Sequence, residues 1–213
     1  MDPDEQAPPP PEPRWPALLA ILTSGLLYAA LPRYLSVGPR WLFLMLICIL
    51  ELPAMISHWR GYHRTYQALG FVVSGVSTSF LLWSIGLLVA NLPAHKESPV
   101  DMLVSAAILW ISNILVFALW YWRLDAGGPT CRDRRAGHRQ GAFLFPQMAI
   151  PHMVDAWSPR FVDYLFVAFN TSTAFSPTDT PVLDRWAKIL CMLQSVISMG
   201  TIVLLAARAV NIM

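Results

Sequence analysis

The chain has 213 residues, of which 55% are hydrophobic and only 13% are charged, and its formal net charge is +2. Soluble domains carry about 25% charged residues, so this composition excludes an ordinary soluble globular protein. The small net charge also argues against a nucleic-acid-binding protein. We therefore predict an all-α integral membrane protein that contacts the lipid bilayer over most of its surface.

Residues 1–14 are rich in proline and carry four acidic side chains, with no apolar periodicity. Runs of proline favour an extended polyproline II conformation, and this acidic end lacks the basic region of a secretory signal. We expect residues 1–14 to form a disordered tail and residues 15–213 to form a single transmembrane domain.

Five apolar runs within that domain have the composition of membrane-spanning helices. They cover about residues 15–31, 41–59, 68–92, 102–122 and 186–211. The first is short, roughly 24 Å at 1.5 Å per residue, against a hydrocarbon core of about 30 Å. Tryptophan residues stand at both ends of the second run, Trp41 and Trp59, as is typical of interfacial anchors.

The second run contains Glu51, a carboxylate deep within an apolar segment. An ionisable side chain inside a membrane is costly, so such a residue is a functional candidate. The alternative is that Glu51 pairs with a basic residue such as Arg208 and only holds helices together. The sequence leaves both interpretations open.

Small and neutral polar residues mark the other runs. Gly70, Ser74 and Thr78 are spaced four residues apart, which favours close approach of neighbouring helices. Asn113 lies at the middle of the fourth run, where we expect an interhelical hydrogen bond of about 0.6–2 kcal/mol. Gln194, together with two nearby serines, gives the last run one polar face.

Between the fourth and last runs, the pattern predicts a half-helix over residues 159–169 and a polar loop over residues 170–180. Such a helix spans about half of a membrane. Backbone that leaves a helix at membrane depth needs water or protein around it, so we predict that this segment is re-entrant. Its pore-loop candidates are Asn170, Thr171, Ser172, Thr173 and Asp179.

The stretch Thr171–Asp179, followed by a polar-faced helix that ends near Arg208, resembles the pore loop and inner helix of potassium-type ion channels. The resemblance implies that Thr173 and Phe175 take the places of the filter threonine and tyrosine, and that a monovalent cation is the transported ion. The filter glycines are absent from this stretch. A carbonyl-lined filter relies on backbone angles that glycine adopts readily.

The chain as a whole resembles a family of bacterial multi-pass membrane proteins of unknown function. The resemblance is carried by residues 117–122, 125–129, 161–165 and 174–179. It implies the same multi-pass membrane organisation and brings no activity with it.

The distribution of basic residues predicts an orientation. With five crossings and a re-entrant half-helix, eleven of the 15 Lys and Arg residues fall on the N-terminal side. The positive-inside rule then places the N-terminus, and the entry of the half-helix, in the cytoplasm. Potassium-channel filters enter from the outside, so this orientation disagrees with that resemblance. If residues 161–179 cross fully instead, the C-terminus also lies in the cytoplasm.

Two functions therefore stay open for a protein of the plasma or inner cell membrane. In the first, a homo-oligomer conducts a monovalent cation along residues 170–179, and Glu51 modulates the path. In the second, the chain is a non-conducting membrane scaffold or partner subunit. We expect no enzyme, metal site or cofactor, because the sequence has no zinc-protease motif, nucleophile elbow or paired acid dyad.

Overall fold

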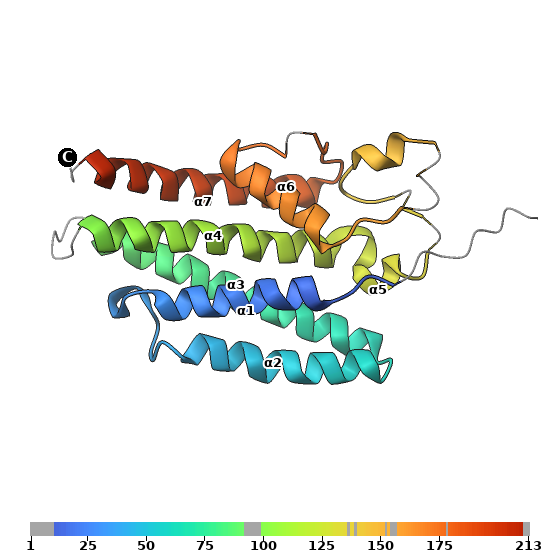
Figure 1. Ribbon diagram of the computed structural model, residues 1–213, viewed down its shortest axis with the longest axis horizontal. Helices are drawn as coiled ribbons and strands as arrows, with labels where there is room; N and C mark the ends of the chain where they lie inside the picture. The colour runs from blue at the N-terminus through green and yellow to red at the C-terminus, as the bar shows by residue number, and fades with distance from the viewer. Residues whose placement is uncertain are drawn as a thin grey trace, which may run out of the picture.

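The computed structural model describes residues 11–91, 99–135, 137–138, 140–151, 153, 157–177 and 179–210. Within them the α-helices (Figure 1) are α1 (Trp15–Ala30), α2 (Leu42–Trp59), α3 (His63–Asn91), α4 (Pro99–Leu124), α5 (Pro129–Arg132), α6 (Phe161–Thr173) and α7 (Arg185–Val210). Short 3-10 turns connect them at η1 (Arg33–Leu35), η3 (Asp125–Gly127) and η4 (Pro146–Ala149).

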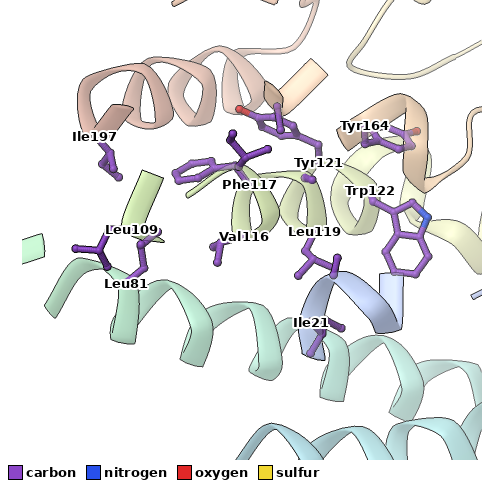
Figure 2. Packing of buried hydrophobic residues seen from close by; sticks show 14 of the residues in the cluster. Ile21, Leu81, Leu109, Val116, Phe117, Leu119, Tyr121, Trp122, Tyr164 and Ile197 are labelled. Atoms are coloured by element: carbon purple, nitrogen blue, oxygen red, sulfur yellow. The ribbon is translucent and has the colours of Figure 1, made fainter. Parts of the chain in front are cut away.

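Helix α4 is the centre of the bundle and packs against α1, α3, α6 and α7, whereas α2 packs against α1 and α3 (Figure 1). Side chains on several sides of α4 are buried, among them Leu109, Phe117 and Tyr121 (Figure 2). A helix that is apolar around most of its circumference needs apolar neighbours on every side. This composition explains why α4 occupies the core.

Four helices are long and apolar enough to cross a membrane: α2, α3, the segment Val100–Gly127 and the segment Arg185–Leu204. Only 22% of the apolar window of α2 is buried inside the bundle, so most of its apolar side chains face outward. A lipid bilayer is the surrounding that suits such a surface. The described chain is all-helical, as expected of an all-α membrane protein, and α1 is apolar but shorter, with 16 residues.

Helix α3 begins at His63, five residues before the run expected from hydropathy. Gly61, with φ of 77°, reverses the chain after α2 and lets the next helix start at once. The first turn of α3 is polar, so hydropathy alone misses it. The other long helices differ from their expected bounds by three residues or fewer.

A sharp turn ends α4. Ala126, Gly127 and Gly128 have φ values of 52°, 82° and 87°, a left-handed conformation that glycine adopts readily. Arg132 of α5 then folds back, and its Nη1 donates to the carbonyl oxygens of Trp122 (2.9 Å) and Asp125 (2.8 Å). The guanidinium therefore satisfies carbonyls that the end of α4 would leave open.

Helix α6 follows α4 for about half of its length and the chain then returns (Figure 1). Near the start of α6, Tyr164 bonds to Asp125 at the end of α4, and near its end Ser172 meets Asn113 in the middle of α4. Val182 then forms an antiparallel bridge with Phe143. The segment thus leaves and rejoins the same end of the bundle, and α7 starts from there.

The half-helix differs from its expected bounds at both ends. It begins at Phe161 rather than at residue 159, because the Asp163 carboxylate accepts the Arg160 N–H (2.7 Å) and caps the helix there. It ends at Thr173 rather than at residue 169. Residues 170–173, which the sequence predicted to lie in the polar loop, are helical. Phe175, with φ of 55°, follows the cap residue in a left-handed conformation that stops the helix.

Residues 11–14 are packed against the bundle, so the prediction of a disordered tail was wrong for them. The Glu12 N–H donates to Asp133 Oδ1 (3.0 Å), and the Glu12 side chain is only 7% exposed. Composition indicated disorder because it does not show that Glu12 has cationic partners far along the chain. The prediction for residues 1–10 lies outside the described residues.

Candidate functional site

A buried ion pair joins α2 to α4. Arg123 Nη2 lies 3.5 Å from Glu51 Oε1, and both side chains are largely buried. The guanidinium occupies space that glycine leaves on α3, since a Cβ at Gly70 would lie 1.7 Å from Arg123 Nη1. The glycine at position 70 of α3 therefore makes room for a side chain of α4.

Arg208, the partner suggested for Glu51 from the sequence, was the wrong choice. Glu51 is the tenth of the 18 residues of α2, and its partner Arg123 lies at the end of α4, at the end of the bundle where α7 begins. Arg208 belongs to the last turns of α7, at the opposite end (Figure 1). The Arg208 side chain itself lies outside the described residues.

A cavity of about 380 Å³ opens beside this ion pair. Its walls come from residues 11–14, the start of α1, the end of α2, the start of α3 and the end of α4. Aromatic rings line it, including Trp15, Tyr66 and Trp122. Its charged lining comes from Glu12, Arg14, Glu51 and Arg123. Ligand pockets in proteins have volumes of about 300–1,000 Å³ with apolar walls and a few polar groups, and this cavity has both properties.

Glu12 closes the cavity on the side of the N-terminal segment. Its carboxylate accepts hydrogen bonds from the Phe161 backbone N–H (2.5 Å), the Trp122 indole N–H (2.9 Å) and Arg14 Nη1 (3.2 Å). Arg132 Nη2 lies 3.7 Å away. Burial raises the pKa of the Glu12 carboxyl, while the bond from Trp122 and the charge of Arg132 act in the opposite direction.

Asp125 forms the second anchor at this end of the bundle. Its fully buried carboxylate accepts the Ala142 N–H (2.5 Å) and the Tyr164 hydroxyl (2.6 Å). His138 Nε2 lies 3.6 Å from the same carboxylate. Burial lowers the pKa of the His138 imidazole, although Asp125 opposes the effect. These contacts hold His138 and Ala142 over the end of α4.

A third polar cluster lies midway along the bundle and carries no formal charge. Gln194 Nε2 donates to Ala168 O (2.7 Å) and Ser172 Oγ (2.8 Å), and its Oε1 accepts the Tyr121 hydroxyl (2.5 Å). Ser198 Oγ donates to Ser172 O (2.8 Å). The Ser172 carbonyl, one of the last in α6, is therefore satisfied by a side chain of α7.

Asn113 also contributes to this cluster. Its Nδ2 lies 3.3 Å from Gln194 O and 3.5 Å from Ser172 Oγ. The structure thus brings together two of the intramembrane polar residues singled out in the sequence, Asn113 and Gln194, and keeps Glu51 apart from them, in the ion pair with Arg123.

The five pore-loop candidates do not share one surface. Thr171 and Ser172 are fully buried, whereas Thr173 and Asp179 are exposed and Asn170 is intermediate. Thr171 Oγ1 donates to Val167 O and Thr173 Oγ1 donates to Phe169 O, both within α6. Because residues 170–173 are helical, their side chains point in different directions around one helix axis, and Asp179 lies outside the helix.

Sequence reasoning missed Glu12, Asp125 and Arg132 as buried residues. Arg132 is only 2% exposed, whereas the neighbouring Arg134 and Arg135 are exposed. The turn formed by Gly127 and Gly128 was the one available signal, because it sends α5 back towards α4.

Among the described residues, no group of three or more His, Cys, Asp or Glu side chains is placed to hold a metal ion. No family model matches the chain, and no curated protein or solved structure matches it significantly. The two resemblances noted from the sequence therefore stay predictions, and the function has to be inferred from the geometry alone.

Proposed function

We propose that this chain is a non-conducting multi-pass membrane protein that serves as a scaffold or partner subunit. In this proposal α1, α2, α3, α4 and α7 are five crossings, and α6 is a re-entrant half-helix that enters and leaves on the same side. The protein resides in the plasma or inner cell membrane, with its N-terminus in the cytoplasm.

The observation that carries the proposal is the bonding of α6 to α7. Gln194 and Ser198 donate to Ala168 O, Ser172 Oγ and Ser172 O, and these bonds join the end of the half-helix to the adjacent full-length helix. Such bonds satisfy backbone that would otherwise end in lipid. They also occupy the polar atoms that an ion would need.

A selectivity filter offers a different arrangement, in which successive backbone carbonyls point into a path and replace the hydration shell of the ion. Residues 170–173 continue an α-helix instead, and Asn170 O accepts the Ala174 N–H (2.8 Å). Helical carbonyls are engaged along the helix axis. This argues for a structural role of the candidate loop rather than a conducting one.

The proposed orientation rests on the basic residues of one bundle end. Arg14, Arg60, Arg123, Arg132 and Arg185 flank the starts or ends of helices that meet there. Arg33 and Arg40 lie in the connection between α1 and α2 at the other end. An excess of Arg and Lys marks the cytoplasmic side of multi-pass proteins.

The proposal is tested by ion flux into liposomes that contain the purified full-length chain. We expect potassium and sodium flux at the level of empty liposomes at every voltage applied, with an ionophore as the positive control and circular dichroism showing that the protein is folded. Flux that depends on the protein and changes in a Thr171→Val variant would restore the pore hypothesis with a monovalent cation as its cargo.

Orientation is tested separately, in a chain whose native cysteines are replaced by serine. Single cysteines at the exposed positions Val37 and Gln140 report the two ends of the bundle. We expect a membrane-impermeant maleimide added to intact cells to label Val37→Cys but not Gln140→Cys. The reverse pattern contradicts a cytoplasmic N-terminus, and labelling of both or neither contradicts the membrane arrangement itself.

A further inference from the structure

The Glu12 carboxylate lies in a site whose donors come from separate parts of the chain. Phe161 contributes the first N–H of α6, Trp122 contributes an indole N–H from α4, and Arg132 contributes a guanidinium from α5. Only Arg14 belongs to the same segment as Glu12. The bundle thus builds a cluster of donors, and the N-terminal segment supplies the anion.

The Arg132 guanidinium has hydrogen-bond donors that Glu12 does not use. Nη1 of Arg132 is engaged in capping α4. Its Nε and Nη2 are buried and make no hydrogen bond within the described part of the chain. A buried guanidinium edge with two open donors suits an anion with more oxygen atoms than a carboxylate, such as phosphate, which arginine binds in a bidentate manner.

The N-terminus of α6 reinforces the preference for an anion. The Phe161 N–H is one of the donors that a helix leaves without an internal partner, and the helix dipole adds partial positive charge there. The adjacent cavity of about 380 Å³ is lined by Pro11 and Pro13 of the same segment as well as by apolar and aromatic side chains. Withdrawal of residues 11–14 would join the cavity to the donor cluster.

We propose that Glu12 occupies a phosphate-binding site, and that a phosphate group, from an anionic lipid headgroup or as the free ion, binds there when residues 11–14 withdraw. The N-terminal segment then acts as a tethered competitor for the site. In the lipid case, the acyl chains follow the apolar cavity between α1 and α2. The inference is independent of whether the protein conducts ions.

The first test uses the full chain in a neutral detergent, with inorganic phosphate titrated at constant ionic strength against chloride. We expect Glu12→Ala to lower the melting temperature and phosphate to restore it in a saturable manner. In the wild-type chain the Glu12 carboxylate occupies the site for most of the time. We therefore expect the wild-type chain to bind phosphate about ten-fold or more weakly than Glu12→Ala does. Adding Arg132→Met to Glu12→Ala should abolish the phosphate effect.

The second arm distinguishes the two sources of phosphate. The same variants are placed in neutral micelles containing either phosphatidic acid or phosphatidylcholine. An Arg132-dependent rise in melting temperature with phosphatidic acid alone assigns a lipid headgroup, and a rise with inorganic phosphate alone assigns the free ion. Either result supports the site. No effect of either phosphate source beyond chloride or phosphatidylcholine, or an equal effect in the double variant, overturns it.

A third measurement keeps Glu12 in place, and it decides the question if Glu12→Ala does not fold. In the chain without native cysteines, Pro11→Cys reports the position of the N-terminal segment. Pro11 is exposed before any displacement, so a nitroxide spin label attached to this cysteine is used. Phosphatidic acid or inorganic phosphate should shift its spectrum from an immobilised to a mobile form, because displacement frees the segment from the bundle. An unchanged spectrum with both phosphate sources contradicts displacement and overturns the proposal.

Discussion

Two buried polar regions of this bundle use different chemistry. At the end where α4 finishes, Glu51, Arg123, Glu12 and Arg132 bring opposite formal charges together. Midway along α4, the cluster around Gln194 consists of neutral amides and hydroxyls. On α4 the two regions are marked by Arg123 and Asn113, which are ten residues apart, or about 15 Å along the helix axis.

In the proposed membrane arrangement, the difference follows from depth. A charged side chain is far more costly at the centre of a bilayer than near its surface, and Arg123, Glu12 and Arg132 lie at one end of the bundle, close to the polar segment that connects α4 to α6. Helix α6 ends midway along the bundle, where its Ser172 carbonyl needs a donor. Gln194 and Ser198 supply donors there without adding charge. Position along the bundle therefore determines which kind of polar group is used.

The largest expected loss of stability comes from removing the partner of a buried charge. Arg123→Met removes the cation beside the buried Glu51 carboxylate. Breaking a buried pair in this way destabilises a protein by about 3–5 kcal/mol. Equilibrium unfolding of the purified chain in detergent measures the loss.

The double variant Arg123→Met with Glu51→Gln is the control for that prediction. It removes both charges, so it should recover most of the lost stability. If Arg123→Met has the same free energy of unfolding as the wild-type chain, the ion pair does not stabilise this end of the bundle. The charged region would then contribute no more stability than the neutral cluster.

A smaller loss is expected when the space for Arg123 is filled. Gly70→Ala would place a Cβ 1.7 Å from Arg123 Nη1. The guanidinium is the flexible end of its side chain and has to move away from Glu51, which we expect to cost up to about 3 kcal/mol, as overpacking does. The change in unfolding free energy is measured as above.

Gly75→Ala is the matched control on the same helix. No atom lies within 4 Å of a Cβ built at Gly75, and alanine favours a helix by about 0.5–1 kcal/mol over glycine. We therefore expect Gly75→Ala to be neutral or slightly stabilising. Equal losses for both substitutions would mean that the contact of Gly70 with Arg123 has no special role.

The neutral cluster should respond more weakly. Gln194→Leu removes three side-chain hydrogen bonds, with Ala168 O, Ser172 Oγ and the Tyr121 hydroxyl. Interhelical hydrogen bonds in membranes average about 0.6 kcal/mol each, so we expect a loss of about 2 kcal/mol. Ser198→Ala removes the bond to Ser172 O and the bond that Ser198 Oγ accepts from the Trp110 indole N–H, and should cost about 1.2 kcal/mol. A larger loss for Ser198→Ala than for Gln194→Leu would contradict the assignment.

The smallest effect is a pH dependence at the charged end. His138 faces Asp125, Arg132 and Arg135, and burial lowers its pKa below the ordinary value of 6.5. Below pH 6.5 the His138 imidazole is protonated in the unfolded chain, whereas in the folded chain it stays neutral to a lower pH. The stability that neutral His138 contributes is therefore full above pH 6.5 and declines as the pH falls. Melting temperatures measured between pH 7.5 and pH 5 should decrease more for the wild-type chain than for His138→Gln. Parallel decreases would show that other groups cause the acid sensitivity.

Local patterns predicted the parts of this molecule that depend on nearby residues. Long apolar runs gave the long helices, because lipid requires every backbone group in such a run to bond within the helix. The dipeptide Gly127–Gly128 indicated the turn after α4, because its backbone needs positive φ. The small residues at Gly70, Ser74 and Thr78 indicated close packing on α3, where Trp120 of α4 now bonds to Thr78 (2.8 Å).

The candidate site depended on partners that no local pattern reveals. Glu51 stood out by itself, but its cation lies 72 residues later, at Arg123. Glu12 appeared to belong to a disordered tail, and its bond to the Phe161 N–H joins positions 149 residues apart. The end of α6 also depends on a distant residue, because Ser198 of α7 donates to the Ser172 carbonyl in its last turn.

The amino-acid sequence by itself therefore determined that this chain forms apolar helices, roughly where they begin and end, and that a few polar residues lie among them. Only the tertiary structure decided which of those residues meet. Helix formation follows from the composition of adjacent residues, whereas ion pairs and capping bonds follow from how whole helices pack. A buried charge is tolerated only where packing brings a partner to it.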